Sequence, residues 1–327
     1  MFLRIMIALV VTTISTIVSR QLFHYNPPGF FILLFYLLMY VAVNRTLSID
    51  QEDATRAHEP MPGRFEWPLS GPLNRLGKSF GGILFSAVFW FTHFLSILNP
   101  FQLKQVMNQL TGNAELEKRE KAKGKNGSDY ETKADYRLPF HGEWLVYNGG
   151  MTPETSHSWE ILSQRYALDF VQADDEFKRH KGKGNQLKDY YCYGEEILAA
   201  ASGFVIQTEN SISDAPFPGW GFCDFTAKSF TGNFVLIQHA EGEYGFYAHL
   251  IKESICVSPG EFVEQGQVIG KCGHSGHSSE PHLHFHIQDS SDFFKGMGVP
   301  VKFHNIEIDQ TFIEKGYVRL GQWVRQI

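Results

Sequence analysis

The stretch EPHLHFHIQ, residues 280–288, places three histidines in five positions, in alternation with apolar residues. Such alternation predicts a half-buried β-strand, with the leucine and phenylalanine in a core and His282, His284 and His286 on the opposite face. Residues two apart on a strand are separated by roughly 6.5–7 Å, so two imidazoles can share a small site, whereas residues four apart, at roughly 13 Å, cannot easily share one ion. Because imidazole is a common zinc ligand, the pattern favours a metal site. The plainer alternative is three exposed histidines on a solvated sheet face.

The whole chain has 327 residues, enough for one large soluble domain and a further region. Its formal net charge is −6, and no basic stripe stands out. Proteins that bind nucleic acid usually carry such a stripe, so the composition argues against a nucleic-acid partner.

The first 98 residues differ in character from a soluble domain. Three apolar runs, residues 5–18, 30–43 and 80–98, each approach the length of about 20 residues that a membrane helix needs. The first run lacks a small-residue cleavage site, and a second run follows at once, which favours an anchor over a signal peptide. We therefore expect residues 1–98 to form a membrane region with about three transmembrane helices, in contact with the lipid bilayer.

Orientation follows from the basic residues. Residues 44–79 carry five of them, Arg45, Arg56, Arg64, Arg75 and Lys78, whereas the turn at 23–29 carries none. The positive-inside rule then places residues 44–79 in the cytoplasm. Three spans would leave everything after Leu98 outside the bacterial cytoplasmic membrane. If the third run only lies on the surface, the C-terminal domain stays inside.

The rest of the chain divides by composition. Residues 99–135 end in the stretch ELEKREKAKGKNGSDYETKAD, highly charged and of mixed sign, which predicts a solvated helix end and linker. From residue 136 to 327, short apolar runs recur between glycines and prolines. This spacing predicts a mostly β, antiparallel domain.

Within that domain the motifs follow a specific order. Asp169 lies in QRYALDF, GEEILAAASGFV comes next, GNFVLIQHAEGEYGFYAHL ends in His249 and Leu250, and VEQGQVIGKCGHSGHSSEPHLHFH closes the set. Together, over residues 138–308, these motifs resemble the lysostaphin-like zinc metallopeptidases, bacterial enzymes that cut peptide cross-bridges in peptidoglycan. The resemblance implies an antiparallel β metallopeptidase domain and a zinc cofactor.

The resemblance also implies roles for individual residues. Asp169 and His284 match the family's zinc ligands, and His249 and His282 match its two catalytic histidines. The chemistry agrees, since a catalytic zinc site has three protein ligands and an open position, and nearby histidines can move a proton or stabilise an oxyanion. The chain has no HExxH helix to offer instead.

One position departs from the family pattern. The third ligand in the family is a histidine four residues before the aspartate, and here that position is Arg165, which cannot bind a metal. We expect His157, in TSHSW upstream, to replace it, with a surface histidine as the plainer interpretation. His286 is the rival, but its spacing places it too far from the ion. His274 and His277 lie in a Gly/Ser loop and are expected to be exposed at the edge of the groove.

The sequence thus predicts a membrane-anchored, zinc-dependent endopeptidase that acts outside the cytoplasmic membrane on peptidoglycan peptides. The Arg165 departure keeps open a catalytically inactive relative that binds and regulates cell-wall hydrolases. An adaptor module is a third possibility, because GEFVEQGQVIGK is also typical of barrel-sandwich hairpins. None of the four cysteines forms a CxxC pair, and Cys256 and Cys272 could either pair or remain free thiols.

Overall fold

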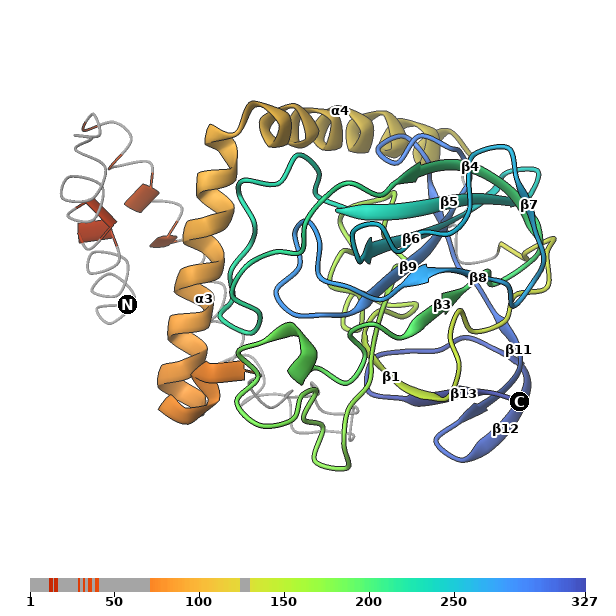
Figure 1. The fold of residues 1–327 in the computed structure, drawn as a ribbon. Helices are drawn as coiled ribbons and strands as arrows, with labels where there is room; N and C mark the ends of the chain where they lie inside the picture. Colours follow the sequence, from red (N-terminus) through yellow and green to blue (C-terminus); the bar gives the residue numbers. More distant parts are fainter. Residues whose placement is uncertain are drawn as a thin grey trace, which may run out of the picture. The chain divides into compact units, whose positions relative to one another are not determined.

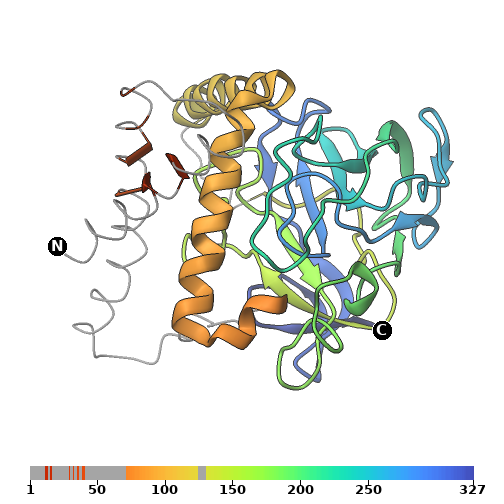
Figure 2. The ribbon, with the colours of Figure 1, turned by 60° about the vertical axis from the view of Figure 1, so that its left-hand side comes forward.

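The computed structural model describes residues 71–123 and 130–327, together with residues 12, 13, 15, 16, 29, 32, 35, 36, 39 and 40. The chain divides into two units, Met1–Gly63 and Arg64–Ile327. The first two expected membrane spans lie almost entirely outside the described residues. The second unit holds the β domain and the helices before it, and its ribbon is drawn in Figures 1 and 2.

Most of this unit is an antiparallel sheet, as the short apolar runs predicted. The main sheet has eleven strands in the order β12-β11-β13-β1-β2-β9-β6-β5-β4-β7, with β10 paired to β9, and β3 and β8 form a small second sheet. The strands are β1 Glu143–Asn148, β2 Leu168–Val171, β3 Glu196–Leu198, β4 Gly203–Glu209, β5 Asn233–Ala240, β6 Glu243–Leu250, β7 Phe262–Val263, β8 Val268–Lys271, β9 Leu283–Gln288, β10 Gly298–Val299, β11 Phe303–Ile308, β12 Thr311–Gly316 and β13 Trp323–Gln326.

The period-two pattern of β9 sets which residues face the core. Leu283, Phe285 and Ile287 are at most 1% exposed and pack in the main apolar cluster, which also contains Trp144 and Phe170. Burying each such side chain contributes about 1.5–3 kcal/mol. A shift of β9 by one residue would move this set to the opposite face, so the core fixes the register that presents the histidines.

The opposite face of β9 is also covered. A smaller apolar cluster of Phe234, Leu236, Phe246 and Ala248 lies there, and the Phe246 ring stacks on His286 at 5.3 Å between centroids. His284 and His286 are consequently only 5% and 1% exposed. The alternative of a solvated row of histidines is therefore wrong for these two residues.

Two helices precede the sheet. After the short 3-10 turn η1 (Gly71–Leu76) come α3 (Lys78–Leu95), the turn η2 (Ser96–Leu98) and α4 (Pro100–Lys123). A linker was expected from residue 99, but α4 packs on the β domain. The fully buried Gln102 donates hydrogen bonds to the backbone oxygens of Asp224 and Ala227, at 2.7 and 2.8 Å. Gly112 approaches the carbonyl oxygen of Phe294 so closely that a Cβ would lie 2.1 Å from it.

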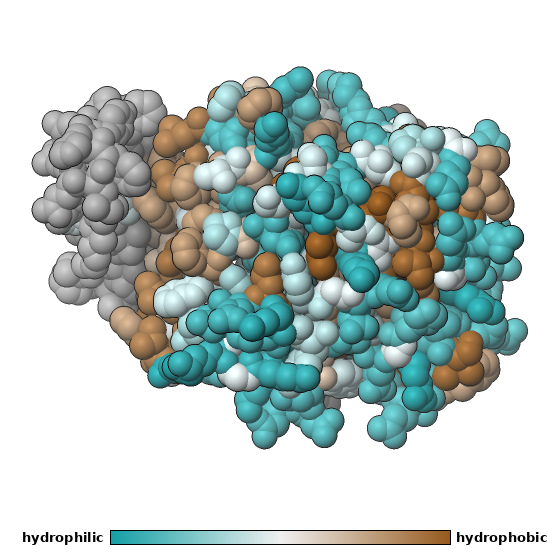
Figure 3. All heavy atoms as spheres, in the orientation of Figure 1, coloured by the Kyte–Doolittle hydropathy of each residue, from teal (hydrophilic) through white to brown (hydrophobic). Residues whose placement is uncertain are grey.

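The apolar helix α3 lies along the same domain. Among the described residues, Phe80–Leu98 is one stretch long and apolar enough to cross a membrane, with a mean hydropathy of 1.7. Before the helix, the Gly71 amide donates to His180 Nε2 at 2.9 Å, and after it the Asn99 side chain donates to the backbone oxygens of Phe225 and Ala227. Apolar surface follows α3 in Figure 3. Three large apolar residues of this helix, Phe80, Ile83 and Trp90, are exposed.

These contacts bear on the expected third span. A helix that crosses a bilayer carries its two ends to opposite sides of a hydrocarbon core about 30 Å thick. Here both flanks of α3 contact the β domain, and several transmembrane helices are not established by the described residues.

Candidate metal centre

The centre begins with a directly paired aspartate and histidine on neighbouring strands. In the register of β2 and β9, Asp169 lies opposite His284. Their side chains emerge on the same face, and Asp169 Oδ1 lies 3.0 Å from His284 Nδ1. Opposed residues on antiparallel strands have Cβ atoms about 4.5–5.5 Å apart, which is close enough for two short polar side chains to share one site.

His157 completes the set from a loop. The Ser156 hydroxyl donates to the Arg165 carbonyl oxygen at 2.8 Å, and the Ser158 hydroxyl donates to that of Gln164 at 2.6 Å. These two bonds, one on each side of His157, fold the loop back along the chain. His157 Nδ1 then lies 3.6 Å from Asp169 Oδ2. The His157 side chain is 37% exposed, so it borders solvent.

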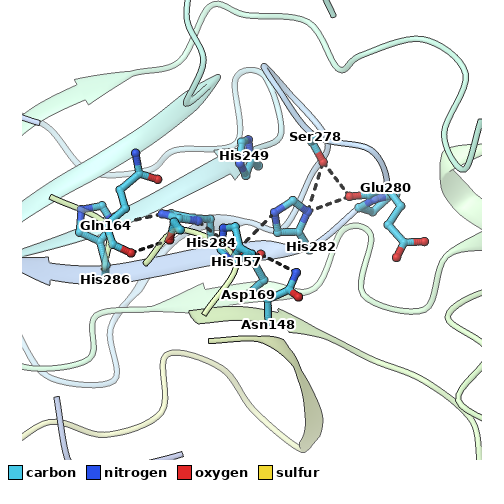
Figure 4. A network of polar contacts seen from close by, with 12 residues as sticks. Asn148, His157, Gln164, Asp169, His249, Ser278, Glu280, His282, His284 and His286 are labelled. Carbon is cyan, nitrogen blue, oxygen red and sulfur yellow. Dashed lines mark hydrogen bonds and ion pairs between the residues drawn. The ribbon is translucent and has the colours of Figure 1, made fainter. Parts of the chain in front are cut away.

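One donor atom from each of His157, Asp169 and His284 lies within 4.8 Å of the other two (Figure 4). Arg165, at the family's usual ligand position, turns away from the centre. Its guanidinium contacts Glu120 Oε1 on α4 at 2.7 Å and stacks over the Trp159 ring. The structure thus brings together the three residues predicted as ligands and leaves Arg165 to join the loop to α4.

A chain of hydrogen bonds fixes the proton on His284. Gln288 Nε2 donates to the Ser290 carbonyl oxygen, so its Oε1 must accept from His286 Nε2, at 3.0 Å. Burial first, and the neighbouring His284, lower the pKa of His286 to about 3, so its ring is neutral. Its unprotonated Nδ1 therefore accepts from His284 Nε2, at 3.1 Å. In neutral His284 this leaves the Nδ1 lone pair facing Asp169.

This arrangement fits a cation. A lone pair on His284 Nδ1 and a carboxylate oxygen of Asp169 face each other at 3.0 Å, and only a second proton on the ring or a cation between them satisfies both. Burial would raise the pKa of Asp169, but His157, His282 and His284 hold it well below the usual 3.8. Two imidazoles and one carboxylate form a donor set that suits zinc.

His249 lies near the end of β6, beside the three donors. Its φ of 62° is left-handed, a conformation that a non-glycine residue rarely adopts and that often occurs at functional sites. The chain can pass close by because residue 273 is glycine, where a Cβ would lie 2.8 Å from the His249 carbonyl oxygen. The ring lies 5.9 Å from that of His284, and its Nδ1 is 2.7 Å from the Ser275 carbonyl oxygen.

The His282 ring is held by the same kind of contact as the His249 ring, between Nδ1 and a backbone carbonyl oxygen. Its Nδ1 lies 2.8 Å from the Glu280 carbonyl oxygen, and its ring centroid is 4.7 Å from that of His249. Because a carbonyl oxygen only accepts, the Nδ1 of each ring carries the proton and Nε2 carries the lone pair. Burial first, then His282 and His284, lower the pKa of His249 well below 6.5, so this ring is neutral. Both predicted catalytic histidines thus adjoin the donor set.

The loop before His282 is held by a buried ion pair that sequence reasoning missed. Arg179 Nε lies 2.6 Å from Glu280 Oε1, and the two side chains are only 2% and 5% exposed. The guanidinium also lies over the Tyr147 ring, 4.8 Å from its centroid. Residues 179 and 280 are far apart in the sequence, and neither has a local pattern that would reveal the pair.

Two expectations for this loop are wrong. His274, expected at an exposed edge, is 0% exposed, with its Nδ1 2.8 Å from Ser278 Oγ. His277 is half-buried against the Phe230 ring, at 4.5 Å between centroids, and its Nε2 lies 2.8 Å from Gln102 Oε1. Packing against Gln102 of α4 and against Phe230, which local composition does not encode, covers the His277 ring.

Comparison with known proteins gives a consistent result. The sequence model of Peptidase family M23 matches residues 183–296. The peptidoglycan DD-endopeptidase ShyA of Vibrio cholerae serotype O1 is 41% identical over 94 residues, which are 29% of this chain and 17% of that protein. ShyC of the same organism, also a peptidoglycan DD-endopeptidase, is 43% identical over 58 residues, 18% of this chain and 13% of that protein.

The chain therefore spans less than a fifth of the length of either curated relative. Among solved structures, the catalytic domain of lysostaphin from Staphylococcus simulans is 18% identical, with a TM-score of 0.27, over 48% of this chain and 88% of that one. The resemblance that the motifs indicated is confirmed by the family match: this chain carries a domain of peptidase family M23, the lysostaphin-like peptidases.

Proposed function

We propose that this protein is a zinc-dependent endopeptidase that hydrolyses peptide bonds in cell-wall peptidoglycan. The observation that carries the proposal is the meeting of His157, Asp169 and His284, with donor atoms within 4.8 Å of one another, beside the rings of His249 and His282. Matches to M23 peptidoglycan endopeptidases support a peptidase that acts on peptidoglycan.

In this proposal His157, Asp169 and His284 hold the ion. When bound, zinc supplies an activated water and polarises the scissile carbonyl group. His286 acts through His284, because its Nδ1 accepts the Nε2 proton and keeps the Nδ1 lone pair of His284 toward the centre. Such orienting partners typically change metal affinity 10–100-fold when they are removed.

The two remaining histidines move protons and stabilise charge. His249 and His282 each donate from Nδ1 to a backbone carbonyl oxygen, so each keeps Nε2 available at the centre. A neutral ring can accept the proton of the attacking water, and once protonated it can stabilise a developing oxyanion or donate to the leaving amine. The Glu280 carbonyl and the Arg179–Glu280 pair position His282 for this task.

We further propose that the chain is anchored in the cytoplasmic membrane and that the β domain acts outside it, where peptidoglycan lies. The apolar runs at 5–18 and 30–43 support the anchor. The contacts at both ends of α3 favour a helix that lies along the β domain, with Gly71 on the domain's side. With the domain outside, this proposal also places the basic segment 44–79 outside, against the orientation that the positive-inside rule gives. The side of the domain is assigned here from its peptidoglycan substrate and not from the basic residues. The position of His157 beside Asp169 and His284 supports the active enzyme over the inactive regulator, because His157 can supply the donor that Arg165 cannot.

The test is hydrolysis of purified peptidoglycan by the full chain in detergent. Release of soluble fragments with new amino termini is expected from the parent, and loss of this activity is expected after chelation, with recovery on adding zinc. His282→Ala should abolish cleavage without lowering metal content, because His282 is not among the three proposed ligands. A parent protein that binds zinc and cleaves no peptidoglycan peptide would contradict the proposal and favour the regulatory alternative.

A further inference from the structure

A second group of metal-binding side chains lies where α3 meets the β domain. One ring nitrogen of His93, one of His277 and the sulfur of Cys223 lie within 4.8 Å of one another. His93 is on α3, whereas Cys223 and His277 belong to two loops of the β domain. None of the three takes part in the proposed active centre. We propose that this group binds a divalent transition-metal ion, zinc above all, which ties α3 to the β domain.

The donor set has the chemistry of a zinc site. Zinc binds thiolate sulfur at about 2.3 Å and imidazole nitrogen at about 2.0–2.1 Å, usually in a tetrahedron, so its ligand atoms lie about 3.3–3.6 Å apart. Atoms already within 4.8 Å of one another reach that spacing by moving about 1 Å each. Two imidazoles and one thiolate exclude Mg²⁺ and Ca²⁺, which prefer oxygen ligands.

The backbones that carry the ligands are held in place. The Cys223 amide donates to the Thr92 hydroxyl at 3.0 Å, next to His93 in the sequence. Gly221, with a φ of 72°, allows this loop to approach α3, because a Cβ there would lie 2.5 Å from the Phe85 carbonyl oxygen. The His277 amide donates to the Phe230 carbonyl oxygen at 2.8 Å. A preorganised site of this kind loses little entropy when an ion binds.

The tautomer of His277 is also set in advance. The Gln102 amide nitrogen donates to the backbone oxygens of Asp224 and Ala227, so its Oε1 must accept from His277 Nε2, at 2.8 Å. Imidazole binds a metal ion in its neutral form. The lone pair of His277 is therefore on Nδ1, with Gln102 as the orienting partner that metal-binding histidines usually have.

The sulfur of Cys223 is shielded from solvent, since this residue is only 3% exposed. The site would also influence catalysis indirectly, because His277 precedes by a few residues the Glu280 carbonyl that positions His282. A bound ion would hold that loop against α3.

Cobalt(II) tests the site without relying on peptidase activity. The proposed active centre contains no sulfur, so a thiolate-to-cobalt charge-transfer band in the near ultraviolet would report the second site alone. We expect the metal-stripped full chain in detergent to develop this band on titration with Co²⁺. Cys223→Ser should abolish it, and His93→Ala or His277→Ala should weaken Co²⁺ binding by more than about tenfold.

Two controls make the result specific. Cys256 is the exposed cysteine, and Cys256→Ser should keep the band. Asp169→Ala should also keep it, which separates this site from the proposed active centre. Absence of the band in the parent would overturn the inference, even if zinc-dependent hydrolysis were found. A band that survives Cys223→Ser but disappears in Cys256→Ser would overturn it as well, by identifying adventitious binding at the surface.

Discussion

Arg179→Met should strongly destabilise the β domain. The guanidinium lies 2.6 Å from Glu280 Oε1, and the two side chains are 2% and 5% exposed, so the change leaves a carboxylate buried without its counter-charge. Breaking a buried pair by removing one partner costs about 3–5 kcal/mol. For a domain of this size each kcal/mol lowers the melting temperature by roughly 2–4 °C, so the expected decrease is roughly 6–20 °C.

The assay is thermal unfolding of the full chain in detergent, with two matched variants. Arg325→Met removes an exposed partner of Glu307, where the side chains are 46% and 19% exposed, and should cost no more than about 1 kcal/mol. The double variant Arg179→Met/Glu280→Gln removes both buried charges and should recover most of the lost stability. If Arg179→Met unfolds within about 1 kcal/mol of the parent, or if the double variant is no more stable than the single one, the reasoning is refuted.

Three further predictions rest on the same kinds of contact. His286→Leu should weaken zinc binding by about 10–100-fold without removing a ligand, as measured by competition with a chelator, and unchanged affinity would contradict the His284–His286 contact. The pKa of His274 is lowered to about 3, mainly by burial and then by His282, whereas an unfolded histidine has a pKa of about 6.5. The contribution of the neutral ring to stability is therefore present above pH 6.5 and is lost on acidification. Between about pH 6 and 4 the free energy of unfolding of the metal-free parent should fall by about 1.4 kcal/mol per pH unit more than that of His274→Asn. Chemical denaturation at several pH values measures this free energy, and an equal dependence on pH in the two proteins would count against a neutral buried ring. On intact cells an impermeant thiol reagent added outside should label Cys256 in the parent. It should also label the new cysteine of Leu76→Cys in a Cys256→Ser background, because both positions are exposed on the same side of the membrane in this proposal. If only one of the two positions is labelled from outside, α3 crosses the membrane.

The strand pattern around residues 280–288 was readable from the sequence because it is local. Alternation placed Leu283 and Phe285 in the core and His284 on the other face, and the structure has this arrangement. The pairing of Asp169 with His284 spans 115 residues and has no local signature. The order of motifs in the family supplied it, and the same order pointed to His249 and His282.

Residues whose role depends on tertiary packing were not predictable. The charged stretch 115–135 indicated a linker over residues 99–135, but Gln102 and Gly112 dock α4 on the β domain through backbone contacts. The sequence offered His286 only as a rival ligand, which its spacing disfavours. Its contact with His284 depends on Gln288, whose amide orientation is fixed by Ser290.

In the proposed metal centre the third ligand is His157, and not residue 165. The most direct measurement is the zinc affinity of the full chain in a Cys223→Ser background, which removes the second proposed site, with His157→Ala and Arg165→Ala compared. We expect about one equivalent of zinc in the parent, far weaker binding in His157→Ala because only two ligands remain, and parental affinity in Arg165→Ala. Parental zinc affinity in His157→Ala would show that His157 is not a ligand.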